Sequence, residues 1–144
     1  IAVAAALLMD QTGSDPVLVV LPADHIIKDK DAFQQHLDIA IAAAGEGNLI
    51  TFGIRPTRPD SGFGYIQTEA AEGSGNNDVI TVRRFTEKPD VETAKQFLEE
   101  GGYYWNSGMF VWKASVILEE IKIHLPEVHA VLSAMRERWR KEPW

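Results

Sequence analysis

The 144-residue sequence predicts an α/β fold in which a mostly parallel central sheet is flanked by helices. An apolar run at residues 17–21, rich in Val and bounded by two prolines, is typical of a strand that is buried on both faces. A helical pattern follows, and a second apolar run comes at residues 49–54. A strand, a helix and a strand in this order form a right-handed unit whose two strands are parallel.

Two helices have clear boundaries in the sequence. The first joins these strands, because residues 33–44 carry apolar side chains at helical spacing and Asp29 or Asp31 is a candidate cap. Residues 90–100 predict the second helix, which Asp90 caps and two glycines end.

The other elements are shorter. They are an apolar helix at residues 1–9, strands at 65–68 and 79–86, an Asn-Ser-Gly turn leading into a strand within 103–112, a helix at 116–121 and a helix from Pro126. The polar stretch 72–78 predicts a turn or loop. Neither a repeat nor a linker divides the sequence, so we expect residues 1–144 to form the central part of a single domain.

Composition excludes several classes of function. The net charge of −7 and the lack of a basic stripe argue against nucleic-acid binding, and the basic residues Arg136, Arg138, Arg140 and Lys141 predict a solvated helix face. Without cysteine there is no thiol nucleophile and no disulfide framework. The apolar start is too short to span a membrane. These features predict a cytoplasmic protein with no membrane or nucleic-acid partner.

Asp24 is the first candidate for chemistry. It follows the predicted strand at 17–21, and the carboxyl ends of strands are where open α/β sheets bind ligands. A carboxylate in this place can hold Mg²⁺ that is bound to a triphosphate. From position alone, a turn in which Asp24 is a cap and His25 packs against it is the better explanation.

The other candidates lie in three short motifs. In the first, Gly62, Gly64 and Tyr65 form a loop whose backbone a ligand could approach closely, or a hairpin turn. In the second, Glu87 and Lys88 suit a sugar hydroxyl and a phosphate, or are solvated surface residues. In the third, Asn106 stands beside two aromatics and suits vicinal hydroxyls, or belongs to a turn.

Together these motifs resemble one family, the bacterial mannose-1-phosphate guanylyltransferases. The resemblance extends from about residue 15 to 128, through VVLPADH (19–25), TFGIRPTRP (51–59), SGFGYI (61–66), FTEKPD (85–90) and YYWNSGMF (103–110). It implies a Rossmann-like fold of the nucleotide-diphospho-sugar transferase type. It also implies synthesis of GDP-mannose and pyrophosphate from GTP and mannose 1-phosphate, with Mg²⁺ as cofactor.

The resemblance assigns a role to each candidate. Asp24 would be the Mg²⁺ ligand, and Asp24 and Lys88 the catalytic residues, with Lys88 holding the sugar phosphate. Gly62, Gly64 and Tyr65 would lie at the sugar nucleotide, and Glu87 and Asn106 would bind mannose hydroxyls.

Two parts of the family pattern are absent from this sequence, namely the Gly-rich triphosphate loop and a later metal-binding Asp. We therefore expect a fold that is truncated at both ends and a chain that is inactive alone. Self-association through an uncovered sheet edge is a further expectation. Two alternatives stay open, the same chemistry with another sugar or nucleotide, and a non-catalytic regulatory or binding subunit of the same fold.

Overall fold

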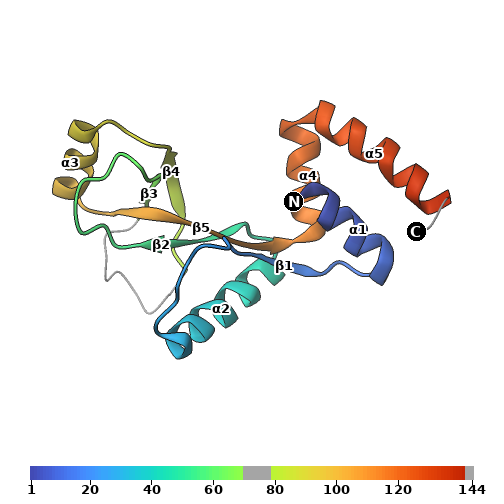
Figure 1. Ribbon diagram of the computed structural model, residues 1–144, viewed down its shortest axis with the longest axis horizontal. Helices are drawn as coiled ribbons and strands as arrows, with labels where there is room; N and C mark the ends of the chain where they lie inside the picture. The colour runs from blue at the N-terminus through green and yellow to red at the C-terminus, as the bar shows by residue number, and fades with distance from the viewer. Residues whose placement is uncertain (70–78, 142–144) are drawn as a thin grey trace. The chain divides into compact units, whose positions relative to one another are not determined.

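The computed structural model describes residues 1–69 and 79–141, and the predicted loop at 72–78 lies outside them (Figure 1). The described residues form five helices and one sheet of five strands. In chain order the elements are α1 (Ala2–Thr12), β1 (Val17–Val20), α2 (Lys30–Gly45), β2 (Ile50–Ile54), β3 (Tyr65–Thr68), β4 (Val82–Thr86), α3 (Val91–Glu100), β5 (Tyr103–Lys113), α4 (Ala114–His124) and α5 (Pro126–Lys141). The predicted α/β class is confirmed.

The chain divides into two compact units. Unit 1 comprises Ile1–Val20, Ile41–Ile50 and the chain from Val111 onward, and unit 2 comprises Leu21–Ala40 and Thr51–Phe110. Helix α2 and strands β2 and β5 contribute residues to both units. All the candidate site residues belong to unit 2. That the whole chain is the central part of one domain stays a prediction.

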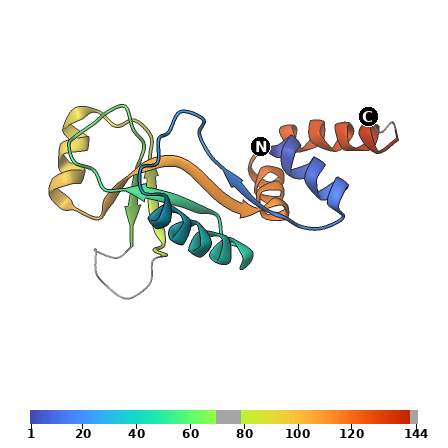
Figure 2. The same cartoon turned by 60° about the horizontal axis from the view of Figure 1, so that its bottom comes forward.

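Unit 1 is built on three helices, α1, α4 and α5, which lie side by side in Figures 1 and 2. Its core contains three alanines that are completely buried, Ala5, Ala6 and Ala114, together with Leu118 and Leu132. Alanine has the highest helix propensity, and its small side chain lets helix backbones approach closely. The apolar start of the sequence is therefore a packed helix, as predicted. No helix among the described residues is both long and apolar enough to cross a membrane.

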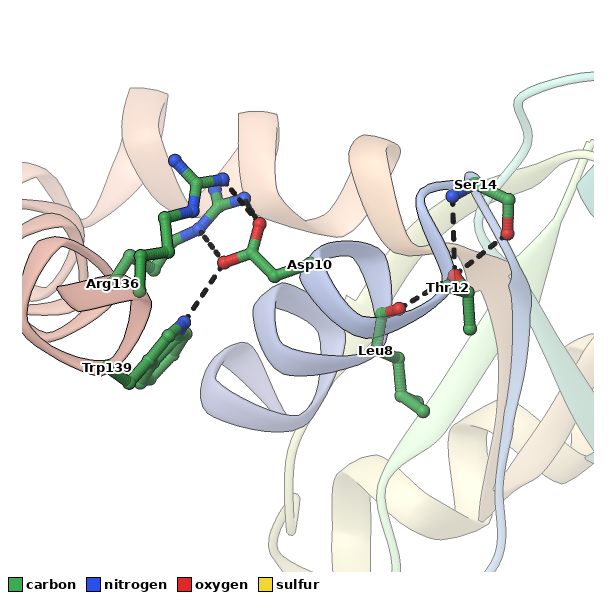
Figure 3. A network of polar contacts seen from close by, with 7 residues as sticks. Leu8, Asp10, Thr12, Ser14, Arg136 and Trp139 are labelled. Carbon is green, nitrogen blue, oxygen red and sulfur yellow. Dashed lines mark hydrogen bonds and ion pairs between the residues drawn. The ribbon is translucent and has the colours of Figure 1, made fainter. Parts of the chain in front are cut away.

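The carboxylate of Asp10 joins α1 to α5 (Figure 3). It accepts two hydrogen bonds from Arg136, at 2.7 Å from Nη2 and 3.1 Å from Nε, and another from Trp139 Nε1 at 3.0 Å. Arg140 also donates to it. These bonds, first those from Arg136 and Arg140, hold the pKa of Asp10 well below its usual range. The predicted solvated face is therefore wrong for Arg136, whose side chain is half-buried, while Arg140 is exposed although it also bonds to Asp10.

A second carboxylate, that of Asp15, holds the start of α4. It accepts hydrogen bonds from the Ser115 amide at 2.8 Å and from the Ser115 hydroxyl at 2.6 Å. Burial alone would raise the pKa of Asp15, but the bonds from Ser115 lower it overall. An acidic residue 100 positions away therefore satisfies an amide that the helix itself leaves without a partner.

Unit 2 is organised around β3, which pairs antiparallel with both β4 and β5. The core on one face of this sheet contains Tyr65, Tyr103 and Trp105, with Ala94 and Phe97 of α3 packed against them. The rings of Phe97 and Tyr103 stack at a centroid distance of 4.1 Å and an angle of 10°. Helix α3 begins as predicted, because Asp90 Oδ1 accepts a hydrogen bond from the Thr93 amide at 2.7 Å. This capping bond is the main cause of the lowered pKa of Asp90.

The sheet differs from the sequence prediction in direction and in burial. The two pairings of β3 are antiparallel, so the mostly parallel arrangement does not extend to this part of the sheet. Strands β1 and β2 each pair with β5, so the helical crossover joins strands that are not neighbours. Strand β1 is the terminal strand of the order β1-β5-β3-β4, and its Val19 is 37% exposed. The prediction that this strand is buried on both faces is therefore wrong.

The predicted turn at Asn106–Ser107–Gly108 is also wrong, because β5 continues from Tyr103 to Lys113. The local bonds of a turn are present, since the Asn106 and Ser107 side chains accept hydrogen bonds from the amides of Gly108 and Met109. Gly108 takes a φ of 74° that favours glycine, and this irregularity is accommodated without reversing the chain.

Replacing Asp10 with Asn is expected to lower the free energy of unfolding by about 2 kcal/mol at pH 7, since it removes charge-assisted hydrogen bonds. The pKa of Asp10 is lower in the folded than in the unfolded state, so its ionised form stabilises the fold. That contribution is complete above about pH 5. It begins to decline as the pH falls below about 4, the usual value of the unfolded chain, and is fully lost only below the lowered pKa of the folded state. Urea unfolding of the complete gene product from pH 7 to 3 should show a smaller loss for the variant than for the wild type.

Asp38→Asn is the matched control, because Asp38 accepts a hydrogen bond from Gln34 within α2 and its replacement removes the same charge. If both variants were equally stable at pH 7, the assigned role of Asp10 would be contradicted.

Candidate functional site

The register of β3 brings three of the predicted site residues together at one end of its pairings. Tyr65 lies opposite Thr86 of β4 and opposite Trp105 of β5. The residues adjacent to these in the sequence are Gly64, Glu87 and Asn106. The backbone amide of Asn106 donates a hydrogen bond to the backbone carbonyl of Gly64 at 2.8 Å. Because side chains alternate between the faces of a sheet, these three lie on the face opposite to the aromatic core.

Gly64 has no space for a side chain. A Cβ at this position would overlap Glu87 Oε2 and would lie 3.2 Å from Phe85 Cζ. The Glu87 carboxylate therefore lies directly over the Gly64 backbone. The sequence predicted that a ligand could approach the Gly64 backbone closely. In the structure that space is taken by the carboxylate of Glu87, the residue that was predicted to bind the sugar.

The orientation of the Asn106 amide is set by its neighbours. The Thr51 hydroxyl donates to Asn106 Oδ1 at 3.0 Å and also lies 3.0 Å from the Met109 carbonyl oxygen. The Gly108 amide donates to the same Oδ1 at 3.3 Å. The Gly108 amide can only donate, so the side-chain oxygen of Asn106 faces it, which turns the Nδ2 donor away from it. Among the described residues, Nδ2 has no hydrogen-bond partner.

Lys88 follows Glu87 with a backbone φ of 45°, which is unusual for a residue with a side chain. Its Nζ lies 3.9 Å from Glu87 Oε1, and the two side chains are 66% and 58% exposed. Pro89, the next residue, is buried. A fixed backbone thus presents an accessible ammonium beside the carboxylate, an arrangement that can hold a phosphate group and a hydroxyl of one ligand.

Asp24 stands in the segment between β1 and α2, outside the pairings of β3. Its side chain is 87% exposed, and His25 Nε2 is 4.0 Å from its Oδ1. No hydrogen bond or ion pair joins it to Gly64, Glu87 or Asn106 among the described residues, which also contain no group of three or more His, Cys, Asp or Glu residues suited to a metal ion. An exposed, loosely paired carboxylate fits a cation such as Mg²⁺ that takes its other ligands from phosphates and water.

Tyr65 and Gly62 serve the loop that precedes β3. The Tyr65 side chain is completely buried, and its hydroxyl accepts a hydrogen bond from the Asp60 amide at 3.0 Å. The Gly62 amide donates to Asp60 Oδ1 at 2.9 Å. These contacts make Tyr65 a core residue whose side chain supports the glycine loop.

Sequence reasoning missed Thr51, Arg58 and Asp60. Thr51 looks like an ordinary β-branched strand residue, and its bond to Asn106 depends on the pairing of β2 with β5. Asp60 stands two residues before Gly62, a spacing at which an Asp side chain often accepts the later amide. That signal was present in the sequence and could have identified Asp60.

Comparison with known proteins identifies the family. The model of the nucleotidyl transferase family matches residues 1–142. The chain belongs to the nucleotidyl transferase family. Xanthan biosynthesis protein XanB of Xanthomonas campestris pv. campestris (strain B100) is 48% identical over 135 residues. A mannose-1-phosphate guanylyltransferase of Sinorhizobium fredii (strain NBRC 101917 / NGR234) is 46% identical over 137 residues. Each alignment covers 94% of this chain but 27% and 26% of the relative, so the chain spans about a quarter of their length.

Solved structures agree with this assignment. One described as mannose-1-phosphate geranyltransferase from Thermus thermophilus has a TM-score of 0.80 at 32% identity, over 94% of this chain and 38% of that chain. Another, described as mannose-6-phosphate isomerase from Helicobacter pylori, has a TM-score of 0.78 at 38% identity, over 94% of this chain and 50% of that chain. The family resemblance and the fold class predicted from the sequence are confirmed.

Gly64→Ala is expected to leave the fold in place but to displace the Glu87 side chain, because the added methyl group takes the space of a flexible carboxylate. The midpoint of thermal unfolding should fall by only a few degrees, while binding of a sugar phosphate to the complete gene product is expected to weaken by about tenfold or more. Calorimetric titration measures the binding.

Gly45→Ala is the matched control, since a Cβ at Gly45 would meet open space. Equal binding by the two variants would show that the contact between Gly64 and Glu87 has no role in the site.

Proposed function

We propose that the protein containing this chain is a mannose-1-phosphate guanylyltransferase, which joins mannose 1-phosphate to GTP and releases GDP-mannose and pyrophosphate. The observation that carries the proposal is the grouping of Glu87 and Asn106 at the Gly64 backbone, with Lys88 beside the Glu87 carboxylate. A carboxylate, an amide and an ammonium in one small area suit a ligand with both hydroxyls and a phosphate. The name of the Sinorhizobium fredii relative supports the same substrates.

Each residue has a role in this proposal. The Glu87 carboxylate accepts hydrogen bonds from sugar hydroxyls, and the outward Asn106 Nδ2 donates to another hydroxyl oxygen. Lys88 Nζ holds the phosphate by charge-assisted hydrogen bonds. Gly64 leaves room for the Glu87 carboxylate to lie against its backbone, because it adds no side chain there.

The reaction is an in-line displacement. An oxygen of the held phosphate attacks the α-phosphorus of GTP, a new P–O bond forms, and the bond to pyrophosphate breaks. The chain contributes by fixing the attacking phosphate and by balancing its charge with Lys88. Asp24 would hold Mg²⁺ together with triphosphate oxygens and water, and the ion supplies charge neutralisation at those oxygens when bound. No protein nucleophile is required.

The direct test is a coupled assay of pyrophosphate release by the complete gene product with GTP, ATP, UTP or dTTP and a panel of sugar 1-phosphates. The proposal expects the highest kcat/KM with GTP and mannose 1-phosphate. A preference for another pair would identify the same chemistry with different substrates. Binding of mannose 1-phosphate without turnover would indicate the non-catalytic subunit and overturn the enzymatic proposal.

Lys88→Ala should raise the KM for mannose 1-phosphate by roughly tenfold to a hundredfold, because a charge-assisted phosphate contact is lost. The KM for GTP should change by less than about threefold, since GTP is held elsewhere. Steady-state kinetics with each substrate varied in turn measure both constants. Lys95→Ala is the control, as Lys95 is an exposed lysine of α3 that pairs with Glu92. An unchanged KM for mannose 1-phosphate would remove Lys88 from the site.

Asp24→Asn should retain the fold and lose Mg²⁺-dependent turnover, because the amide keeps the shape of the side chain without the charge that attracts the cation. Initial rates over a Mg²⁺ titration, with circular dichroism to check folding, provide the measurement. Asp31→Asn in the first turn of α2 removes the same charge nearby and should be active. Normal turnover of Asp24→Asn at low Mg²⁺ would show that Asp24 is a turn residue.

A further inference from the structure

The loop before Gly64 is held over one aromatic ring. The Arg58 guanidinium carbon lies 5.4 Å from the centroid of the Trp105 ring, and the Phe63 ring lies 4.9 Å from it at an angle of 44°. Trp105 itself is only 8% exposed and belongs to the core beneath the sheet. Both ends of the segment 58–63 are therefore in contact with the same buried side chain.

Asp60 connects the parts of this loop. Its Oδ2 accepts a hydrogen bond from Arg58 Nη2 at 2.7 Å, and its Oδ1 accepts one from the Gly62 amide at 2.9 Å. Its own amide donates to the hydroxyl of the buried Tyr65. The bond from Gly62 is the main reason why the pKa of Asp60 is lowered, so the carboxylate is ionised at neutral pH.

The space around Gly62 shows how closely the loop is packed. A Cβ at Gly62 would lie 3.1 Å from Asp60 Oδ1, closer than ordinary van der Waals contact. The carboxylate thus occupies the space that a side chain at Gly62 would need. The path of the backbone from Asp60 to Gly64 depends on that carboxylate being present.

A change at Asp60 would affect the proposed sugar-binding face through the backbone at Gly64. Tyr65 and Trp105 lie on the face opposite to that of Glu87 and Asn106, and among the described residues no hydrogen bond or ion pair joins Asp60 to Glu87 or Asn106. Gly64, however, contacts both Glu87 and Asn106. Its carbonyl oxygen accepts a hydrogen bond from the backbone amide of Asn106, and its Cα lies under the Glu87 carboxylate. A shift of the loop would move Gly64 relative to both.

We propose that Asp60 is a positioning residue, which fixes the backbone at Gly62–Gly64 and thereby sets the affinity for the sugar phosphate. This inference rests on the proposed function, since it names a further residue for the same site. Arg58 supports Asp60 by neutralising its charge while lying over Trp105. The role is distinct from that of Lys88 and Glu87, which would contact the ligand.

The test uses the complete gene product and the variants Asp60→Ala and Asp60→Asn. Asp60→Ala should raise the KM for mannose 1-phosphate by about tenfold while kcat and the KM for GTP stay within about twofold, as expected for a misplaced binding group. Asp60→Asn keeps an oxygen that can accept the Gly62 amide, so its KM should return to within about threefold of the wild type. Glu92→Ala is the matched control, because it removes a carboxylate whose ion pair with Lys95 is also 2.7 Å long.

Gly62→Ala is a second variant that reaches the same contact from the other side. It should raise the KM for mannose 1-phosphate in the same way, because the methyl group displaces Asp60 Oδ1. Calorimetric titration with mannose 1-phosphate gives binding constants that do not depend on turnover.

The outcomes separate the two proposals. Wild-type turnover with selective loss of mannose 1-phosphate affinity in Asp60→Ala supports both. The role of Asp60 alone is overturned if the wild-type protein turns over and Asp60→Ala has an unchanged affinity for mannose 1-phosphate. The same holds if Asp60→Ala raises the KM for mannose 1-phosphate and the KM for GTP equally. A wild-type protein that binds no mannose 1-phosphate overturns the proposed function and this inference together.

Discussion

The double pairing of β3 is the constraint on which the candidate site depends. Tyr65 lies opposite both Thr86 and Trp105, so one residue fixes the register of three strands whose motifs are far apart in the sequence. A slip of one residue would turn Glu87 and Asn106 to the opposite face and separate them from Gly64. The register is held by burial, because Tyr65 is completely enclosed and contacts the ring of Phe97 at 5.3 Å.

Local signals in the sequence were sufficient for the helices. Asp29 and Asp90 each accept a hydrogen bond from an amide three residues later, as expected of residues that cap a helix. The strands were harder, because composition does not encode direction or neighbours. The Asn-Ser-Gly segment shows why, since its side chains make turn-like bonds while β5 continues through them. Pairing with β2 and β3 outweighs the local preference.

The site could be predicted where its residues stand in a recognisable order, and not where they act through contacts between distant segments. The grouping of Gly64, Glu87 and Asn106 was expected from their motifs, and the geometry adds that Gly64 lies beneath Glu87. The bond from Thr51 to Asn106 joins residues 55 positions apart, and that from Arg136 to Asp10 spans 126 positions. Neither pair carries a spacing signal, so only the fold reveals them.

Lys88 has a consequence for how this site would change over evolution. Among the described residues it is the one residue other than glycine with a positive φ, a conformation that costs about 1 kcal/mol or more for a residue with a Cβ. Glycine or asparagine would adopt the same backbone with less strain. A lineage under pressure for stability alone would therefore drift away from lysine at this position. A basic side chain retained on this strained backbone in a relative would therefore indicate continued selection for phosphate binding, and the sequence of the relative would be enough to recognise it.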